Sequence, residues 1–173
     1  MATLYVTLNM TNDDEFEAAK RRERERFKQA VGEETDATML ILRAHLHSEN
    51  MLERILISKL PRADRLIENA SLTYAQKLTL VDALDCVPDS IISSLRSLNR
   101  LRNQCAHELD KTITDADITK LASPLGKDFT RMKREANHEL PDLLRRIIQY
   151  VCGHIAGTCY ILEHPSEKPS KDK

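Results

Sequence analysis

Apolar residues return at every third or fourth position along most of this 173-residue chain. That spacing places them on one side of an α-helix and leaves the other side to polar residues. The clearest stripes lie in residues 91–105 and 144–162. The chain has only 4 Gly and 6 Pro, whereas a β-sandwich or barrel of short strands needs more turn residues. The sequence therefore predicts an all-α fold.

Start and stop signals divide these stripes into an all-α bundle of about five helices. The first expected helix begins at Thr11, where a capping residue and Asn12 precede three acidic side chains, and it ends at Gly32. A long second helix covers 33–60, because Leu60 followed by Pro61 stops it. The later helices are expected to begin at Ser71 or Thr73, at Asp89 or Ser90, at Thr114 for a short one, and at Pro141.

Three segments carry weaker patterns. Residues 1–10 alternate weakly, which is compatible with a short strand or a loose arm. Residues 62–72 are interpreted as a connector with one short turn, and residues 127–139 as a charged stretch. The expected domains are an N-terminal arm and charged helix at 1–32, a helical domain at 33–163 and a disordered tail at 164–173.

Charge and composition exclude several classes of protein. The chain has 26 Lys plus Arg against 27 Asp plus Glu, a net charge of −1, so contact with nucleic acid must come from a local patch. Aromatic residues are 4 % and Trp is absent, which argues against stacking of bases on rows of aromatic side chains. The longest apolar run, 39–42, is too short to span a membrane.

The cysteines indicate a reducing compartment. Four are present, and no two form a Cys-x-x-Cys pair. His45 and His47 have no cysteines at zinc-type spacing near them. We therefore expect four reduced thiols, mostly in the core of a cytoplasmic protein, and neither a metal nor another cofactor.

One segment concentrates positive charge. Residues 90–107 contain three arginines and no acidic residue. At 100° per residue, Arg102 lies at the edge of the apolar stripe, where its guanidinium faces a packed neighbour and needs a partner. Glu49 on the long second helix is a candidate for that partner, or it is a surface residue.

A second group of polar residues shares the outer face of the same helix. Asn103 and His107 are four residues apart, so Asn103 can orient the imidazole by a hydrogen bond. Arg96 and Arg100 lie close to this face and are candidates for binding a substrate anion. Arg102 and His107 point about 140° apart on a straight helix. Both can reach one phosphate through the length of the Arg side chain, a bend, or the same helix of a second subunit.

Residues 102–107 read Arg-Asn-Gln-Cys-Ala-His. They resemble the Arg-x4-6-His motif of the HEPN superfamily, in which a polar residue often follows the Arg. The resemblance can cover residues 33–162. It implies a small all-α domain that forms a two-fold dimer with its Arg-His helices at the interface. Many such proteins are metal-independent endoribonucleases that act as toxins or in defence against phage, while others are catalytically inactive interaction or regulatory proteins.

The residues permit a specific reaction on RNA. His107 can take the proton of the 2′-OH, a second His107 can protonate the leaving 5′ oxygen, and Arg102 can stabilise charge on the phosphorus. The expected partners are RNA, a second copy of the chain and a cognate antitoxin. One subgroup of HEPN toxins has a Tyr two residues after the His, which its antitoxin modifies. Leu109 stands at that position here, so this form of neutralisation is not expected.

A second charged segment has two interpretations. Residues 20–28 hold six basic and two acidic side chains. They can form an arm that follows phosphates or a solvated helix face, and the interleaved Glu residues favour the solvated face.

Overall fold

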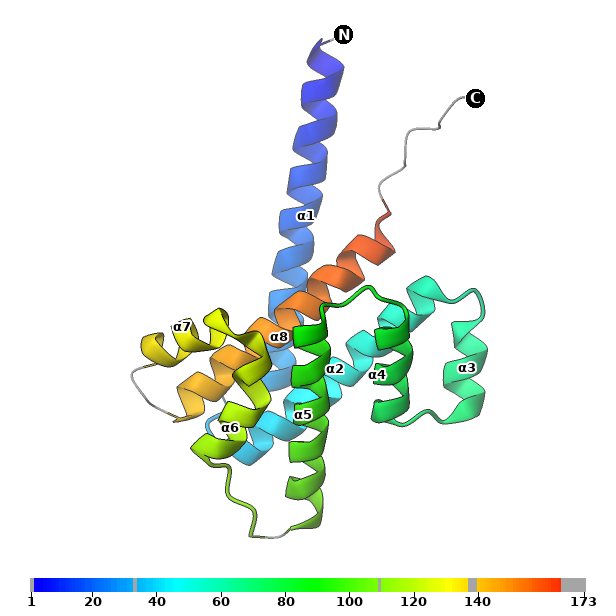
Figure 1. Ribbon diagram of the computed structural model, residues 1–173. Coiled ribbons are helices and arrows are strands. Elements are labelled where there is room, and N and C mark those ends of the chain that lie inside the picture. The colour runs from blue at the N-terminus through cyan, green and yellow to red at the C-terminus, as the bar shows by residue number, and fades with distance from the viewer. Residues whose placement is uncertain (1, 33, 109, 137–139, 166–173) are drawn as a thin grey trace.

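The chain folds entirely into helices and loops over the residues described. The computed structural model describes the backbone of residues 2–32, 34–108, 110–136 and 140–165, and within these ranges the side chains from residue 17 onward. The helices are α1 (Ala2–Val31), α2 (Ala37–Lys59), α3 (Ala63–Ala70), α4 (Tyr74–Ala83), α5 (Asp89–His107), α6 (Asp115–Ala122), the 3₁₀ turn η1 (Ser123–Leu125), α7 (Lys127–Glu135) and α8 (Leu140–Glu163) (Figure 1). The predicted all-α class is confirmed.

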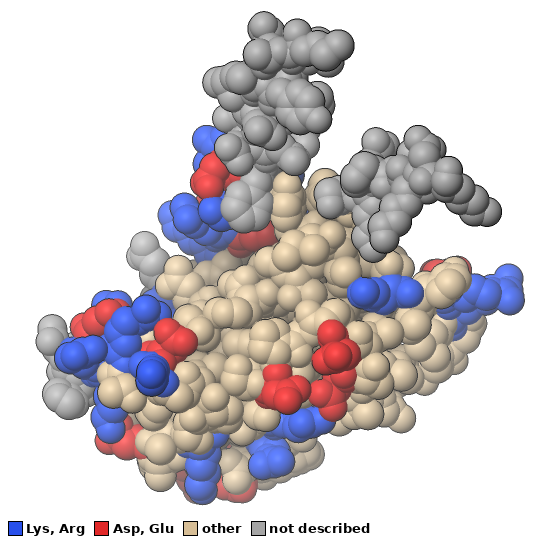
Figure 2. Space-filling view, turned by 45° about the horizontal axis from the view of Figure 1, so that its top comes forward, with Lys and Arg blue, Asp and Glu red and all other residues tan. Residues whose placement is uncertain are grey.

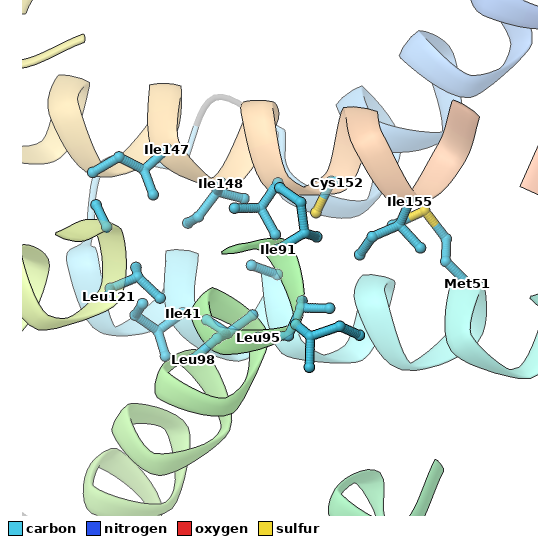
Figure 3. Close-up of a cluster of buried hydrophobic side chains, with 14 of the residues drawn as sticks. Ile41, Met51, Ile91, Leu95, Leu98, Leu121, Ile147, Ile148, Cys152 and Ile155 are labelled. Atoms are coloured by element: carbon cyan, nitrogen blue, oxygen red, sulfur yellow. The ribbon is translucent and has the colours of Figure 1, made fainter. Parts of the chain in front are cut away.

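The core lies where α2, α5 and α8 meet. α2 and α8 share the most extensive contact, and α5 packs across α2. In Figure 3, Ile41 of α2, Leu95 of α5 and Ile147 of α8 belong to one cluster of apolar side chains between the helices, and all three are fully buried. These residues belong to the stripes seen in the sequence, so apolar burial at helical spacing is what assembles the bundle.

Only the first part of α5 is held by this core. Leu95, Leu98 and Leu101 are buried, whereas Asn103 and His107 are exposed. Figure 1 shows the last turns of α5 extending beyond the other helices before the chain returns to α6. The helix therefore has a packed part that ends at Leu101 and a mostly exposed last part, the unpacked half, in which Arg102 and Cys105 are half-buried.

Local caps set several helix ends. The hydroxyl of Thr73 accepts a hydrogen bond from the Gln76 N–H at α4, and the hydroxyl of Thr114 accepts one from the Asp117 N–H at α6, each within a capping box. Both residues were predicted caps. The expectation of Asp89 or Ser90 as the cap of α5 is wrong, because Pro88 holds that position and its carbonyl accepts the first backbone bonds.

The bundle contains more helix than the sequence predicted. α1 begins at Ala2, so the expected strand or arm at 1–10 is wrong. Once a helix has formed, each residue added to it needs to be fixed in conformation but also gains one backbone hydrogen bond, so extension is easier than initiation. The connector at 62–72 contains α3, and the charged stretch at 127–139 contains α7, which buries Met132. α2 begins at Ala37 rather than at 33. Of the expected disordered tail, residues 166–173 lie outside the described part of the chain.

Charged side chains fasten α1 and the turn after it to the bundle. Arg54 of α2 donates two hydrogen bonds of 2.8 Å to the carboxylate of Glu163 on α8 and lies 3.0 Å from Glu23 on α1. Arg145 of α8 donates to the backbone carbonyls of Gly32, at 2.6 Å, and Glu34. Basic and acidic side chains lie side by side at the foot of α1 in Figure 2.

The four cysteines are all free thiols. Cys152 and Cys159 are buried on α8, and burial raises the pKa of each to about 12. Cys86 and Cys105 are half-buried. Buried neutral thiols pack as small apolar groups. None of the helices in the described residues is both long enough and apolar enough to cross a membrane.

Candidate functional site

The candidate site is built on the unpacked half of α5. Arg100, Asn103 and His107 are exposed there, and Arg102 is half-buried at the edge of the apolar stripe, as the helical spacing predicts. His107 is the last residue of the helix, and the N–H of Glu108 bonds back to Gln104. The last turn of a helix leaves backbone carbonyls without a partner inside the helix, so His107 lies beside groups that accept hydrogen bonds.

Arg102 makes one hydrogen bond within the described chain. Its Nη1 donates to Oδ1 of Asn103 at 3.2 Å, and no described carboxylate lies within ion-pair distance of it. Glu49, the candidate partner, instead holds Nζ of Lys77 at 2.8 Å, together with Glu53 at 2.5 Å. Of the two interpretations of Glu49, the pair with Arg102 is therefore not formed, because Lys77 of α4 binds the carboxylates of both Glu49 and Glu53. The guanidinium of Arg102 keeps most of its donors for a ligand.

Within one chain, the structure has no hydrogen bond between the amide of Asn103 and the imidazole of His107. The Asn103 amide oxygen accepts from Arg102, and no hydrogen bond to the imidazole of His107 is made among the described residues. The predicted orientation of His107 by Asn103 is therefore absent from this conformation. Asn103 lies beside the arginine instead.

The two candidate anion-binding arginines differ. Arg96 lies 2.7 Å from Asp82 on α4 in an exposed ion pair. Arg100 is exposed and makes no ion pair with a described residue. Arg100 and Arg102 thus carry the positive charge near His107, and Arg96 is paired with Asp82 instead.

Sequence reasoning missed a contact that the fold adds to this site. His45 of α2 lies with its Nε2 3.0 Å from Oδ1 of Asn99, one turn before Arg102 on α5. The ring of His45 stacks on the ring of Tyr74 with centroids 4.0 Å apart, and the Tyr74 hydroxyl lies 3.0 Å from the Ser48 hydroxyl. Burial is the main cause that lowers the pKa of His45, and the hydrogen bond to Asn99 acts against it.

A signal for part of this contact was present in the sequence. Asn99 stands three and four residues before Arg102 and Asn103, so all three share one side of α5. His45 falls among the buried positions of α2. His45 and Asn99 meet because α2 crosses α5 at this point. The spacing of apolar residues in a sequence does not specify where two helices cross.

The arrangement offers acid–base and anion-binding chemistry. An exposed imidazole can exchange protons with a substrate, and two arginines can hold a phosphate. Within the described residues, no group of three His, Cys, Asp or Glu side chains is placed to hold a metal ion. Leu109 lies outside the described residues, as do the side chains of residues 1–16.

Comparison with family models, with curated proteins and with solved structures finds no match to this chain. The described chain is an all-helical domain whose α5 carries Arg100 and Arg102 in its last turns and ends at His107.

Proposed function

We propose that the chain is a metal-independent endoribonuclease of HEPN type that acts as a homodimer. The observation that carries the proposal is the unpacked end of α5, where Arg102 and His107 lie without a neutralising carboxylate among the described residues. A structural arginine at the edge of a core is ordinarily paired with an acid. No carboxylate of the described residues pairs with Arg102, so its guanidinium keeps donors for a phosphodiester.

The reaction uses the nucleophile that RNA carries. Neutral His107 removes the proton of a 2′-OH, and O2′ attacks the adjacent phosphorus. Arg102 donates hydrogen bonds to the non-bridging oxygens as negative charge builds on them. The bond from phosphorus to O5′ breaks, and a protonated imidazole supplies the proton that O5′ takes up. The products are a 2′,3′-cyclic phosphate and a 5′-OH.

A second copy of the chain completes the site. Arg102 and His107 are five residues apart, about 140° around one helix, so they do not face one phosphate from one chain. Two α5 ends related by a two-fold axis bring Arg102 of each chain towards His107 of the partner subunit. His107 in each chain then takes one of the two proton-transfer roles.

Cleavage of RNA by the purified protein in EDTA tests this proposal. We expect His107→Gln and Arg102→Ala each to lower the rate about 10²–10⁴-fold. His154→Gln on α8 and Arg65→Ala on α3 are the matched controls, because both side chains are exposed and distant from α5 in sequence. Analysis of the product ends must find the cyclic phosphate. Unchanged cleavage by both α5 variants would remove these residues from the mechanism.

We further propose that the nuclease serves as a toxin or phage-defence effector restrained by a cognate antitoxin. Induced expression should then stop growth and degrade RNA, and His107→Gln should do neither. The alternative function is an inactive interaction or regulatory protein. The Arg102–Asn103 hydrogen bond favours that alternative, because it occupies Asn103 away from His107. A stable dimer that neither cleaves RNA nor arrests growth would establish it.

A further inference from the structure

A buried polar cluster lies where α2, α4 and α5 meet. His45 is 7 % exposed, and Ser48 and Lys77 are also buried. One face of the His45 ring lies against Tyr74, which fixes the plane of the imidazole. Ring stacking and a hydrogen bond therefore hold this side chain in one orientation.

The hydrogen bond to Asn99 determines where the imidazole carries its proton. Oδ1 of Asn99 can only accept, so Nε2 of His45, 3.0 Å away, donates to it. Because burial lowers the pKa of His45, the ring is neutral near pH 7 and its single proton lies on Nε2. The amide oxygen of Asn99 is thus held towards α2.

This contact leaves the amide nitrogen of Asn99 without a hydrogen bond among the described residues. Asn99 is half-buried and three residues before Arg102, hence on the same side of α5. An amide N–H beside a guanidinium makes a set of donors that suits a phosphate oxygen.

We propose that Asn99 binds a non-bridging phosphate oxygen of RNA beside Arg102, and that His45 is the positioning residue that keeps the Asn99 amide turned for this contact. The inference rests on the proposed function, since RNA is the ligand of the α5 site. It adds a binding residue and a residue that acts through it, both outside the Arg-to-His segment.

The charged groups around His45 are compatible with a neutral ring that donates a hydrogen bond from Nε2. Glu49 faces it from α2, Tyr74 and Lys77 from α4, and Arg102 from α5. Arg102 and Lys77 oppose a positive charge on the ring and Glu49 favours one. Because the Glu49 carboxylate is paired with Lys77, its attraction for a proton on His45 is weakened, and the ring remains neutral and donates from Nε2.

The test measures affinity for an RNA with 2′-O-methyl groups, which binds without being cleaved. Asn99→Ala should weaken binding about 10-fold, the effect of one hydrogen bond to a charged group. His45→Phe keeps a ring against Tyr74 but removes the donor, and we expect about a 5-fold loss. His45→Gln restores an N–H near the position of Nε2 and should bind within about 2-fold of wild type. His47→Phe is the matched control on the same helix.

The double variant distinguishes positioning from a structural role. Since His45 acts through Asn99, adding His45→Phe to Asn99→Ala should weaken binding no further. Additive losses, or equal losses in His45→Phe and His45→Gln, would overturn the positioning role. Wild-type affinity in Asn99→Ala would overturn the whole inference. Thermal denaturation of each variant confirms that the protein measured is folded.

Failure of the nuclease proposal would look different. Wild-type protein that binds the methylated RNA but leaves unmodified RNA intact would refute the nuclease and leave the variant affinities to decide the present inference. Wild-type protein that does not bind RNA would overturn both. Nitrogen-15 NMR of the imidazoles gives a readout without RNA: His45 must carry its proton on Nε2 in wild type, and any other tautomer contradicts the inference.

Discussion

His45 and His47 stand two residues apart on α2 and meet different neighbours. His45 stacks on Tyr74, whereas His47 packs edge-on to Phe27 of α1 with ring centroids 5.8 Å apart. Burial is the first cause that lowers the pKa of each ring below its ordinary value of 6.5. A buried and a half-buried imidazole on one helix, each with its pKa lowered, make the fold sensitive to mild acid.

We predict that the free energy of unfolding falls between pH 7.5 and pH 5. A histidine whose pKa is lowered on folding contributes stability that is present above about 6.5 and lost as the pH falls towards its folded-state pKa. Urea denaturation at the two pH values measures the change. Glu163, whose pKa Arg54 lowers, loses its contribution only in more acid solution.

His45→Gln and His47→Phe are the variants that check the assignment. Each removes one imidazole whose pKa is lowered on folding, so each should make the stability curve flatter over this range. A slope that is unchanged in both variants would place its origin elsewhere in the molecule.

At the scale of helices, the cap of α4 gives a quantitative prediction. Thr73→Ala removes the side chain that accepts from the Gln76 N–H, and we expect a loss of about 1 kcal/mol in the free energy of unfolding. Thr79→Ala is the control, because Thr79 lies inside the same helix and donates to the carbonyl of Ala75. Urea midpoints of the two variants provide the comparison, and equal midpoints would contradict the importance of the cap.

Caps and long stripes were predictable because they are local. Thr73 and Thr114 act on groups three residues away, and the stripe of α5 lies within one helix. α3 and α7 were missed as helices because each is short and buries one apolar residue, Ala63 and Met132 respectively. So few buried positions do not establish a period, and the helices form through contact with the rest of the bundle.

In the candidate site, too, the local features were predictable from the sequence and the contacts between helices were not. The position of Arg102 at the edge of the apolar stripe, and of Asn103 and His107 on the outer face of α5, follows from helical geometry, and the structure shows Arg102 half-buried and the other two exposed. His45 and Asn99 are 54 residues apart in sequence, and Glu49 finds Lys77 on another helix. Such partners depend on how helices cross, which is set by the packing of the whole core.

At the scale of the whole molecule, one continuous core joins the helices. Leu95 of α5 is fully buried, while Leu46 of α2 is 69 % exposed. We predict that Leu95→Ala lowers the free energy of unfolding by about 2–5 kcal/mol and that Leu46→Ala changes it by less than about 0.5 kcal/mol. Chemical denaturation of both variants measures the difference. A small effect at Leu95 would contradict the placement of α5 against α2 and α8.

The split of α5 into a packed and an unpacked half has a genetic consequence. Under the proposed toxin role, cells forced to make the chain survive through missense changes that silence it. Changes at the exposed residues of this segment, such as Asn103 and His107, would leave full-length protein at normal abundance, because these side chains add little to the core. Changes at Leu95 or Ile155 would instead expose the chain to proteolysis. An immunoblot of the surviving cells should therefore separate two groups of substitutions. Those that keep full-length protein should lie after Leu101 on α5, and those that lose it should lie in the core.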